Sequence, residues 1–198
     1  MQCFTVILLQ ASLPLLLLFP APAQAQGTPR LPDGQLVSGT LSFDGHATAG
    51  DFTGTTSDVT GRLIGAADLT NARGWVEAPV KSLKTGDKRR DKDLNKSLES
   101  DKYPTIRFDL ERVNRVGGSA DSAAVNLHGE LKIHGVARQV DLPATVRLTR
   151  TDARVQSDFP LSLKDYRIGG LTKLFGMLKM YDGIEVHVDL VFRLAGGG

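Results

Sequence analysis

Apolar residues occupy every second position in many segments of this chain, with polar residues between them. The clearest example is IEVHVDLVFRL at 184–194. Another, QLVSGTLSFDG at 35–45, places Val37, Gly39, Leu41 and Phe43 on one face. A period of two is the pattern of a β-strand that buries one face and exposes the other. The chain is therefore predicted to be built largely from half-buried strands.

Further segments of this kind are separated by turn residues such as Gly117-Gly118 and His134-Gly135. They lie at 51–55, 59–66, 73–83, 105–113, 124–135, 136–148 and 155–163. About eight strands with few helical stretches, and no regular alternation of strand and helix, predict an all-β antiparallel fold, either a barrel or a sandwich.

Two stretches interrupt the alternation. The first is the charged block after Gly86, in which Leu94 and Leu98 stand at the i, i+4 spacing of a short helix. Its cations would either meet an anionic headgroup or membrane surface, or form the solvated face of that helix. The second, LTKLFGMLKM at 171–180, carries apolar residues at i, i+3, i+4 and i+7. It predicts a helix that either plugs one end of the fold or forms a flap over a ligand tunnel.

The N-terminus has the features of a secretory signal. An apolar run ends in the small-residue steps Ala21-Pro22-Ala23 and Ala23-Gln24-Ala25. We expect a signal peptide at 1–25, a short flexible segment at 26–34 and one domain at 35–195, located in the periplasm or secreted. Because Cys3 would leave with the signal, the mature chain would have no cysteine for disulfides, thiol catalysis or Cys-based metal sites.

Composition and motifs narrow the function. The formal net charge of +2 is too balanced to suggest nucleic acid as a partner. The four histidines are scattered without the spacing of a metal site, and each is expected at the surface. No serine stands in a nucleophile elbow and no glycine-rich loop matches a phosphate cradle. We expect no enzyme, no catalytic residues, no metal and no cofactor other than a bound lipid.

Two ordered motifs resemble the YceI-like family of polyisoprenoid-binding proteins. One begins at Ser82-Leu83 and ends at Ile106 and Phe108, and the other begins with GELKIHG at 129–135. The motif positions taken as structural are Thr85, Gly86, Arg90, Asp91, Tyr103, Pro104, Gly129 and Gly135. The resemblance also singles out the pair Arg90 and Asp91, which we expect to anchor the helix to the barrel end.

The resemblance implies an extended, lipocalin-like, eight-stranded antiparallel β-barrel with short helical insertions. Its apolar tunnel would hold a polyisoprenoid lipid, such as an isoprenoid quinone or a polyprenyl lipid, in a bacterial periplasm. Burial of apolar area alone can drive such binding. The candidate lipid-binding residues are Leu41, Phe43, Val76, Ala78, Val80, Ile106, Phe108, Leu131, Ile133, Val140, Leu142, Phe159, Leu161, Leu174, Phe175, Leu178, Ile184, Val186 and Val188.

For any one of these residues alone the pattern favours ordinary core packing, because a core and an apolar tunnel use the same residue types, and only the set predicts a tunnel. The alternative function is therefore a secreted interaction or structural module whose interior is filled by side chains. A third alternative is an accessory that hands a quinone to a membrane redox protein, which would require transient contact with the membrane or that protein. The sequence leaves open whether the chain is a monomer or a homodimer.

Overall fold

The computed structural model describes residues 31–48, 50–65, 68–119, 121–169, 172–173 and 178–195, with the backbone alone at 172–173 and 178–179. Nearly all of this part of the chain is strand. The strands are β1 (Gly34–Ala47), β2 (Phe52–Thr56), β3 (Thr60–Ile64), β4 (Arg73–Pro79), β5 (Thr105–Gly118), β6 (Ser122–Ile133), β7 (Val136–Leu148), β8 (Asp152–Ser162), β9 (Thr172–Lys173) and β10 (Leu178–Leu194).

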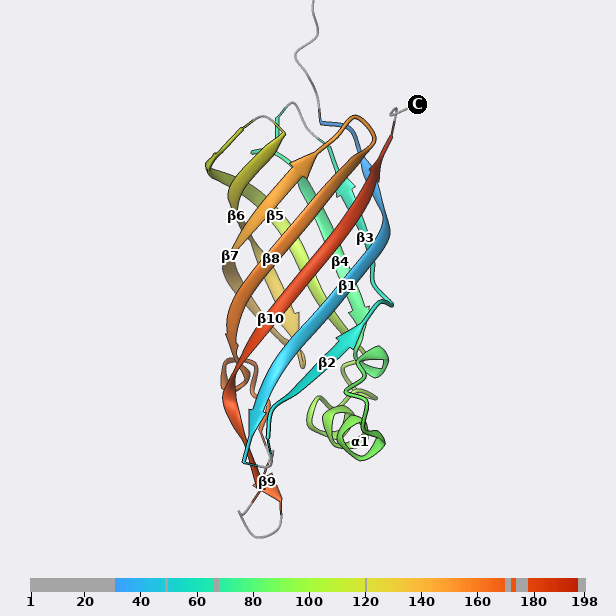
Figure 1. Cartoon of the computed structure of the whole chain (residues 1–198), viewed down its shortest axis with the longest axis vertical. Helices are drawn as coiled ribbons and strands as arrows, with labels where there is room; N and C mark the ends of the chain where they lie inside the picture. Colours follow the sequence, from blue (N-terminus) through green and yellow to red (C-terminus); the bar gives the residue numbers. More distant parts are fainter. Residues whose placement is uncertain are drawn as a thin grey trace, which may run out of the picture.

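The strands close into a barrel. They pair antiparallel in the order β2-β1-β3-β4-β5-β6-β7-β8-β10-β9, and β1 also pairs with β10. Strands β2 and β3 follow one another along the same edge of β1, so together they occupy one position in an eight-stranded wall (Figure 1). The predicted barrel is confirmed, and the sandwich alternative is wrong, because closure leaves one continuous wall around a single interior.

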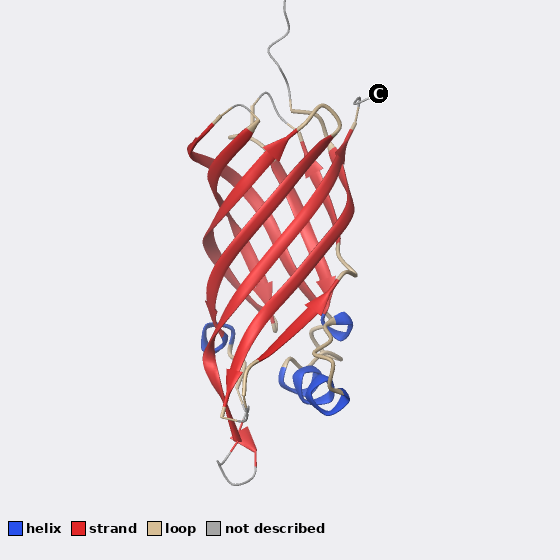
Figure 2. Cartoon of the chain, in the orientation of Figure 1, coloured by secondary structure: helices blue, strands red, loops and turns tan. Residues whose placement is uncertain are grey.

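The charged block forms the helix α1 (Lys88–Ser97), as predicted. Its N-cap, Asp87, accepts hydrogen bonds from the backbone N–H groups of Arg89 and Arg90, which satisfies two of the unpaired donors at a helix start. Two 3-10 helices, Val80–Ser82 and Leu163–Tyr166, lie at the same barrel end as α1 (Figure 2). None of the described helices has the length and apolar character needed to span a membrane.

Strand β1 contains a bulge at Val37, and the prediction that Val37 faces inward is therefore wrong. Its register against β10 shifts between Leu36 and Ser38, and the intervening Val37 is 53% exposed. An extra residue in one strand reverses the inward and outward positions on either side of it. Val37 therefore does not share the inward face of Leu41 and Phe43, and the partly buried Leu36 packs against the core in its place.

The helix predicted at 171–180 is wrong where the structure describes this stretch. Thr172 and Lys173 of β9 pair with Lys179 and Leu178 of β10, which makes a narrow antiparallel extension of the barrel. The apolar spacing at 171–178 fits a helix, but Leu178 and Met180 also continue the alternation of β10. Continuity with this long strand outweighs the local pattern. Residues 170–171 and 174–177 lie outside the described residues.

Two parts of the wall lack regular strand pairing. Residues 57–59 separate β2 from β3 as a loop that bulges outward (Figure 1). The second is between β7 and β8, where only 145–148 pair with 153–156. Pro143 and Pro160 lie in the stretches of β7 and β8 that do not pair with each other. Proline is favoured where a strand has no partner on one side, because it has no N–H to donate to a ladder.

Candidate functional site

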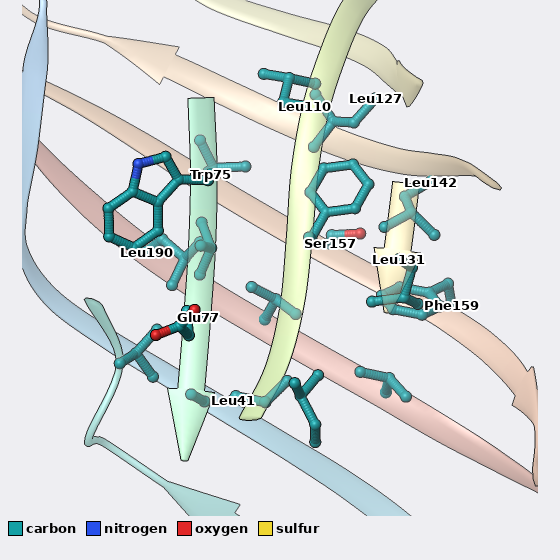
Figure 3. Close-up of a pocket in the computed structure, with 18 of the residues that line it drawn as sticks. Leu41, Trp75, Glu77, Leu110, Leu127, Leu131, Leu142, Ser157, Phe159 and Leu190 are labelled. Atoms are coloured by element: carbon teal, nitrogen blue, oxygen red, sulfur yellow. The ribbon is translucent and has the colours of Figure 1, made fainter. Parts of the chain in front are cut away.

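The barrel encloses an apolar cavity of about 220 Å³. About 10–15 Å³ in this measure holds one water molecule, so the cavity is far larger than a packing defect. Its lining includes Leu31 and Leu69 from the end remote from α1, and Leu94, Leu98 and Ile168 from the α1 end. The cavity therefore extends along the barrel. Figure 3 shows leucines from several strands around it.

Most of the predicted wall lines this cavity. The predicted residues that do so are Leu41, Phe43, Val76, Ala78, Ile106, Phe108, Leu131, Ile133, Leu142, Phe159, Leu161, Ile184, Val186 and Val188. They come from seven strands, and each faces inward because alternation along its strand places it there. The strand pattern thus identified the inner surface of the barrel as a set.

Two predicted residues do not line the cavity. Val80 is 1% exposed but lies in the 3-10 helix after β4, because the chain leaves the strand at Pro79 and the alternation stops there. Val140 packs against the core on the part of β7 that has no partner in β8. Leu174 and Phe175 lie outside the described residues, and Leu178 lies in β10 with only its backbone described.

Several lining residues were not among the predicted set. Some, including Leu127, Val146 and Leu190, alternate on the same strand faces and could have been found by the same rule. Leu94 and Leu98 have the helical spacing noted above and line the cavity, but the sequence contains no signal that predicts how α1 is oriented relative to the barrel. Leu31, Val59 and Leu69 come from irregular segments, where no period predicts which way a side chain points.

Few polar residues border the cavity. Among the described residues they are Ser42, Arg62, Glu77, Ser97 and Ser157. Glu77 and the neighbouring Trp75 alternate with the inward Val76, and both contact Arg107, whose guanidinium stacks 4.7 Å from the centre of the indole ring and lies 3.2 Å from Glu77. Of the five, Ser157 alone is buried, with 4% of its surface exposed.

Of the pair expected to anchor α1, Arg90 contacts a barrel strand and Asp91 contacts the loop that leads into the helix. Arg90 stacks its guanidinium 4.6 Å from the ring centre of Phe52 on β2. The Asp91 carboxylate accepts hydrogen bonds from the backbone N–H of Thr85 at 2.8 Å and from its hydroxyl at 2.7 Å. These bonds hold the pKa of Asp91 below its usual value. Gly86 supplies the positive φ of +77° at which the chain turns into the helix.

The second motif meets the first at this same end. Gly135 adopts φ +71° in the β6–β7 turn, and a Cβ atom there would lie 2.3 Å from the Tyr103 ring. Pro104 accepts a hydrogen bond from the backbone N–H of Val80. Gly129 leaves no room for a side chain, since a Cβ would lie 2.2 Å from the backbone oxygen of Asp109. The two glycines are therefore required by close packing, and Pro104 contributes a backbone acceptor.

His134 is not at the surface, contrary to expectation. Only 11% of its side chain is exposed, and the ring packs edge-on against Tyr103. Its Nε2 lies 2.8 Å from the Glu99 carboxylate and its Nδ1 lies 3.1 Å from the backbone oxygen of Tyr166. The turn at 134–135 gives the ring this direction, because φ is +52° at His134. His134 thus connects the β6–β7 turn to the segment after α1.

A polar cluster crosses three strands on the outer face. His187 of β10 lies between Asp158 of β8, at 2.6 Å, and Asp44 of β1, at 3.1 Å. The hydrogen bond to Asp158, followed by that to Asp44, raises the pKa of His187 despite some desolvation. Neither this cluster nor any other group of three or more histidine, cysteine, aspartate or glutamate side chains among the described residues is placed to hold a metal ion.

We compared this barrel with curated proteins, solved structures and protein-family models. A search of curated proteins found no match. Among solved structures, a polyisoprenoid binding domain from Saccharophagus degradans has a TM-score of 0.66 at 18% identity, covering 83% of this chain and 99% of its own. BcnA from Burkholderia cenocepacia has a TM-score of 0.64 at 18% identity, covering 77% and 95%. A YceI protein from Campylobacter jejuni scores 0.57 at 16% identity, covering 71% and 83%.

At these identities the solved structures show a shared fold. The family model for the YceI-like domain matches residues 36–192, which is most of the chain and nearly all of the barrel. Both sequence motifs fall within this match. The chain is therefore a member of the YceI-like domain family.

Proposed function

We propose that this protein binds a polyisoprenoid lipid in the barrel cavity and sequesters or carries it without catalysis. The observation that carries the proposal is the long cavity with an almost wholly apolar lining. An isoprenoid chain is apolar and slender, and each Å² of it removed from water contributes roughly 25 cal/mol. The similarity to the S. degradans polyisoprenoid binding domain supports the same ligand class.

The alternative of a structural module with a filled interior has less support. That alternative predicts side chains packed to native density inside the barrel, whereas the barrel encloses about 220 Å³. A void of this size loses packing contacts along its whole lining unless something fills it. The proposal therefore gives the cavity an occupant.

We also propose that residues 1–25 direct the protein to the periplasm, where it would take up lipid near a membrane. Cell fractionation of the full chain, compared with a chain lacking these residues, tests the location. Periplasmic recovery of the full chain only is expected, and equal cytoplasmic recovery of both would contradict it.

Native mass spectrometry tests the function. Protein isolated from the periplasm of its bacterial host should carry a mass that organic extraction removes and identifies as an isoprenoid. The delipidated protein should then take up geranylgeraniol, a C20 isoprenoid alcohol, in a one-to-one complex. If no lipid is retained and no isoprenoid is taken up, lipid binding is wrong.

A further inference from the structure

Among the polar residues that line the cavity in the described part of the chain, only Ser157 is buried. Three polar residues are buried within the described part of the chain, Thr56, Ser100 and Ser157, and among them only Ser157 lines the cavity. It lies on β8, and Figure 3 shows its oxygen beside Leu142 of β7. A buried hydroxyl in apolar surroundings costs free energy unless it is hydrogen-bonded. The position is therefore a polar subsite candidate within the cavity.

The hydroxyl proton of Ser157 is donated to another group of the protein. Its Oγ lies 2.7 Å from the backbone oxygen of Pro143. A carbonyl oxygen can only accept, so Ser157 must be the donor of this hydrogen bond. The hydroxyl oxygen keeps its lone pairs, and the carbonyl keeps a second one. Ser157, which lines the cavity, consequently presents an acceptor to it and no free donor.

The fold explains why the Pro143 oxygen is available. Regular pairing of β7 with β8 stops at Thr145 and Gln156, so Pro143 lies beyond the ladder. The bond from Ser157 takes the place of a backbone bond across the two strands. Pro143 itself contributes no N–H to this position. The polar pair thus results from the same break in pairing that the proline permits.

The charges around the cavity argue against an anionic ligand end. Arg62 is the one cation among the described lining residues. It lies on β3, not beside β8, and faces Asp33 at 3.5 Å with 57% of its side chain exposed. A phosphate or diphosphate at Ser157 would be buried without a compensating charge, which is strongly unfavourable.

We propose that the Ser157 hydroxyl oxygen, held in place by the bond to the Pro143 carbonyl, is a subsite that accepts a hydrogen bond from the neutral hydroxyl end of an isoprenoid ligand. The inference rests on the proposed function and specifies its ligand class. A quinone carbonyl or an ether oxygen brings only lone pairs to groups that already present lone pairs, so it would be disfavoured. The subsite selects an alcohol, phenol or quinol end.

The test uses a matched pair of variants, Ser157→Thr and Ser157→Val. Their side chains are nearly isosteric, and only threonine keeps the hydroxyl. Each delipidated protein is titrated with geranylgeraniol and with geranylgeranyl methyl ether, which has the same chain but no donor. The ratio of the two affinities is internal to each variant, so changes in packing or stability cancel. Ser100→Ala, at a buried serine that does not line the cavity, is the control.

Wild type, Ser157→Thr and Ser100→Ala should prefer the alcohol over the ether, and Ser157→Val should lose about fivefold to tenfold of this preference, the range for one buried hydrogen bond. Equal ratios in the threonine and valine variants would overturn the subsite while leaving lipid binding intact. Loss of the preference in Ser100→Ala as well would show that the preference does not report on the Ser157 hydroxyl, and would also overturn the subsite. If wild type binds neither compound, the proposed function itself fails. Should Ser157→Val not fold, Ser157→Cys replaces it as the variant with a poor acceptor.

Discussion

The cavity wall and the end of the barrel at α1 are built in different ways. In the wall, aliphatic and aromatic side chains from eight strands face one space, and its apolar character belongs to the whole set of them. At the α1 end, individual residues make specific contacts: Arg90 with Phe52, Asp91 with Thr85, and Gly135 with Tyr103. The wall should therefore tolerate exchange of one apolar residue for another of similar volume, whereas the α1 end should not tolerate substitution.

The largest effect should come from filling the cavity. Ala78→Phe places a ring in the space that an isoprenoid chain would occupy, because Ala78 is buried and lines the cavity. We expect uptake of geranylgeraniol to weaken about 100-fold, near the upper end of the cost of overpacking. Ala124→Phe, on the exposed face of β6, is the matched control and should bind as wild type does. Titration followed by native mass spectrometry measures both; unchanged uptake by Ala78→Phe would show that the lipid lies elsewhere.

The next effect tests the specific contacts of the α1 end. Gly135 and Gly86 have similar positive φ values, +71° and +77°, but only Gly135 is in contact with another residue at the Cβ position. Gly86→Ala should cost about 1 kcal/mol of unfolding free energy from backbone strain alone. Gly135→Ala should cost about 2–3 kcal/mol, since the Tyr103 ring must also move. Urea unfolding gives both values, and equal losses would mean that Tyr103 yields without cost.

A smaller effect is expected at the anchor of α1. Asp91→Asn removes a charge from the two hydrogen bonds with Thr85, and we expect it to lower the free energy of unfolding by about 1 kcal/mol, because the site is partly exposed. Lys92→Ala on the exposed side of the same helix should change it by less than about 0.5 kcal/mol. Hydrogen exchange should locate the loss in α1. Protection that falls uniformly over the barrel would argue against a local anchor.

The same contrast explains what the sequence could predict. The alternation of apolar and polar residues predicted the barrel strands and most of the inner wall. It could do so because the apolar side of a strand with a period of two is the side that is buried. It failed at Val37, where a bulge reverses the faces, and at Val80, where the strand ends in a 3-10 turn. Both failures arise where backbone geometry changes without a signal in the apolar pattern.

The alternation of apolar and polar residues could not predict contacts between residues that lie far apart in the chain. The resemblance identified Tyr103 and Gly135 but not that they touch, and His134 was expected at the surface although it packs on Tyr103. Ser157 was visible only as one polar position within a strand. Its importance depends on Pro143, fourteen residues earlier, and on the separation of β7 from β8. Such pairings follow from barrel closure and cannot be read from local periodicity.

The smallest predicted effect concerns the outer face, away from both regions. The raised pKa of His187 means that its protonated form is favoured in the folded state, chiefly through the hydrogen bond to Asp158. This stabilisation is complete below the ordinary pKa of about 6.5 and is lost as pH rises through the raised folded value. Asp44, whose pKa is lowered by Thr53 and then by His187, contributes above about pH 3.8 and loses its contribution as pH falls through its lowered value.

Unfolding free energy should therefore decline modestly from pH 6 to 8 in wild type and less in His187→Gln, with His46 titrating in both proteins as an internal reference. Identical pH profiles for the two proteins would show that the His187 cluster contributes nothing to stability, and that the barrel depends on its interior and its α1 end alone.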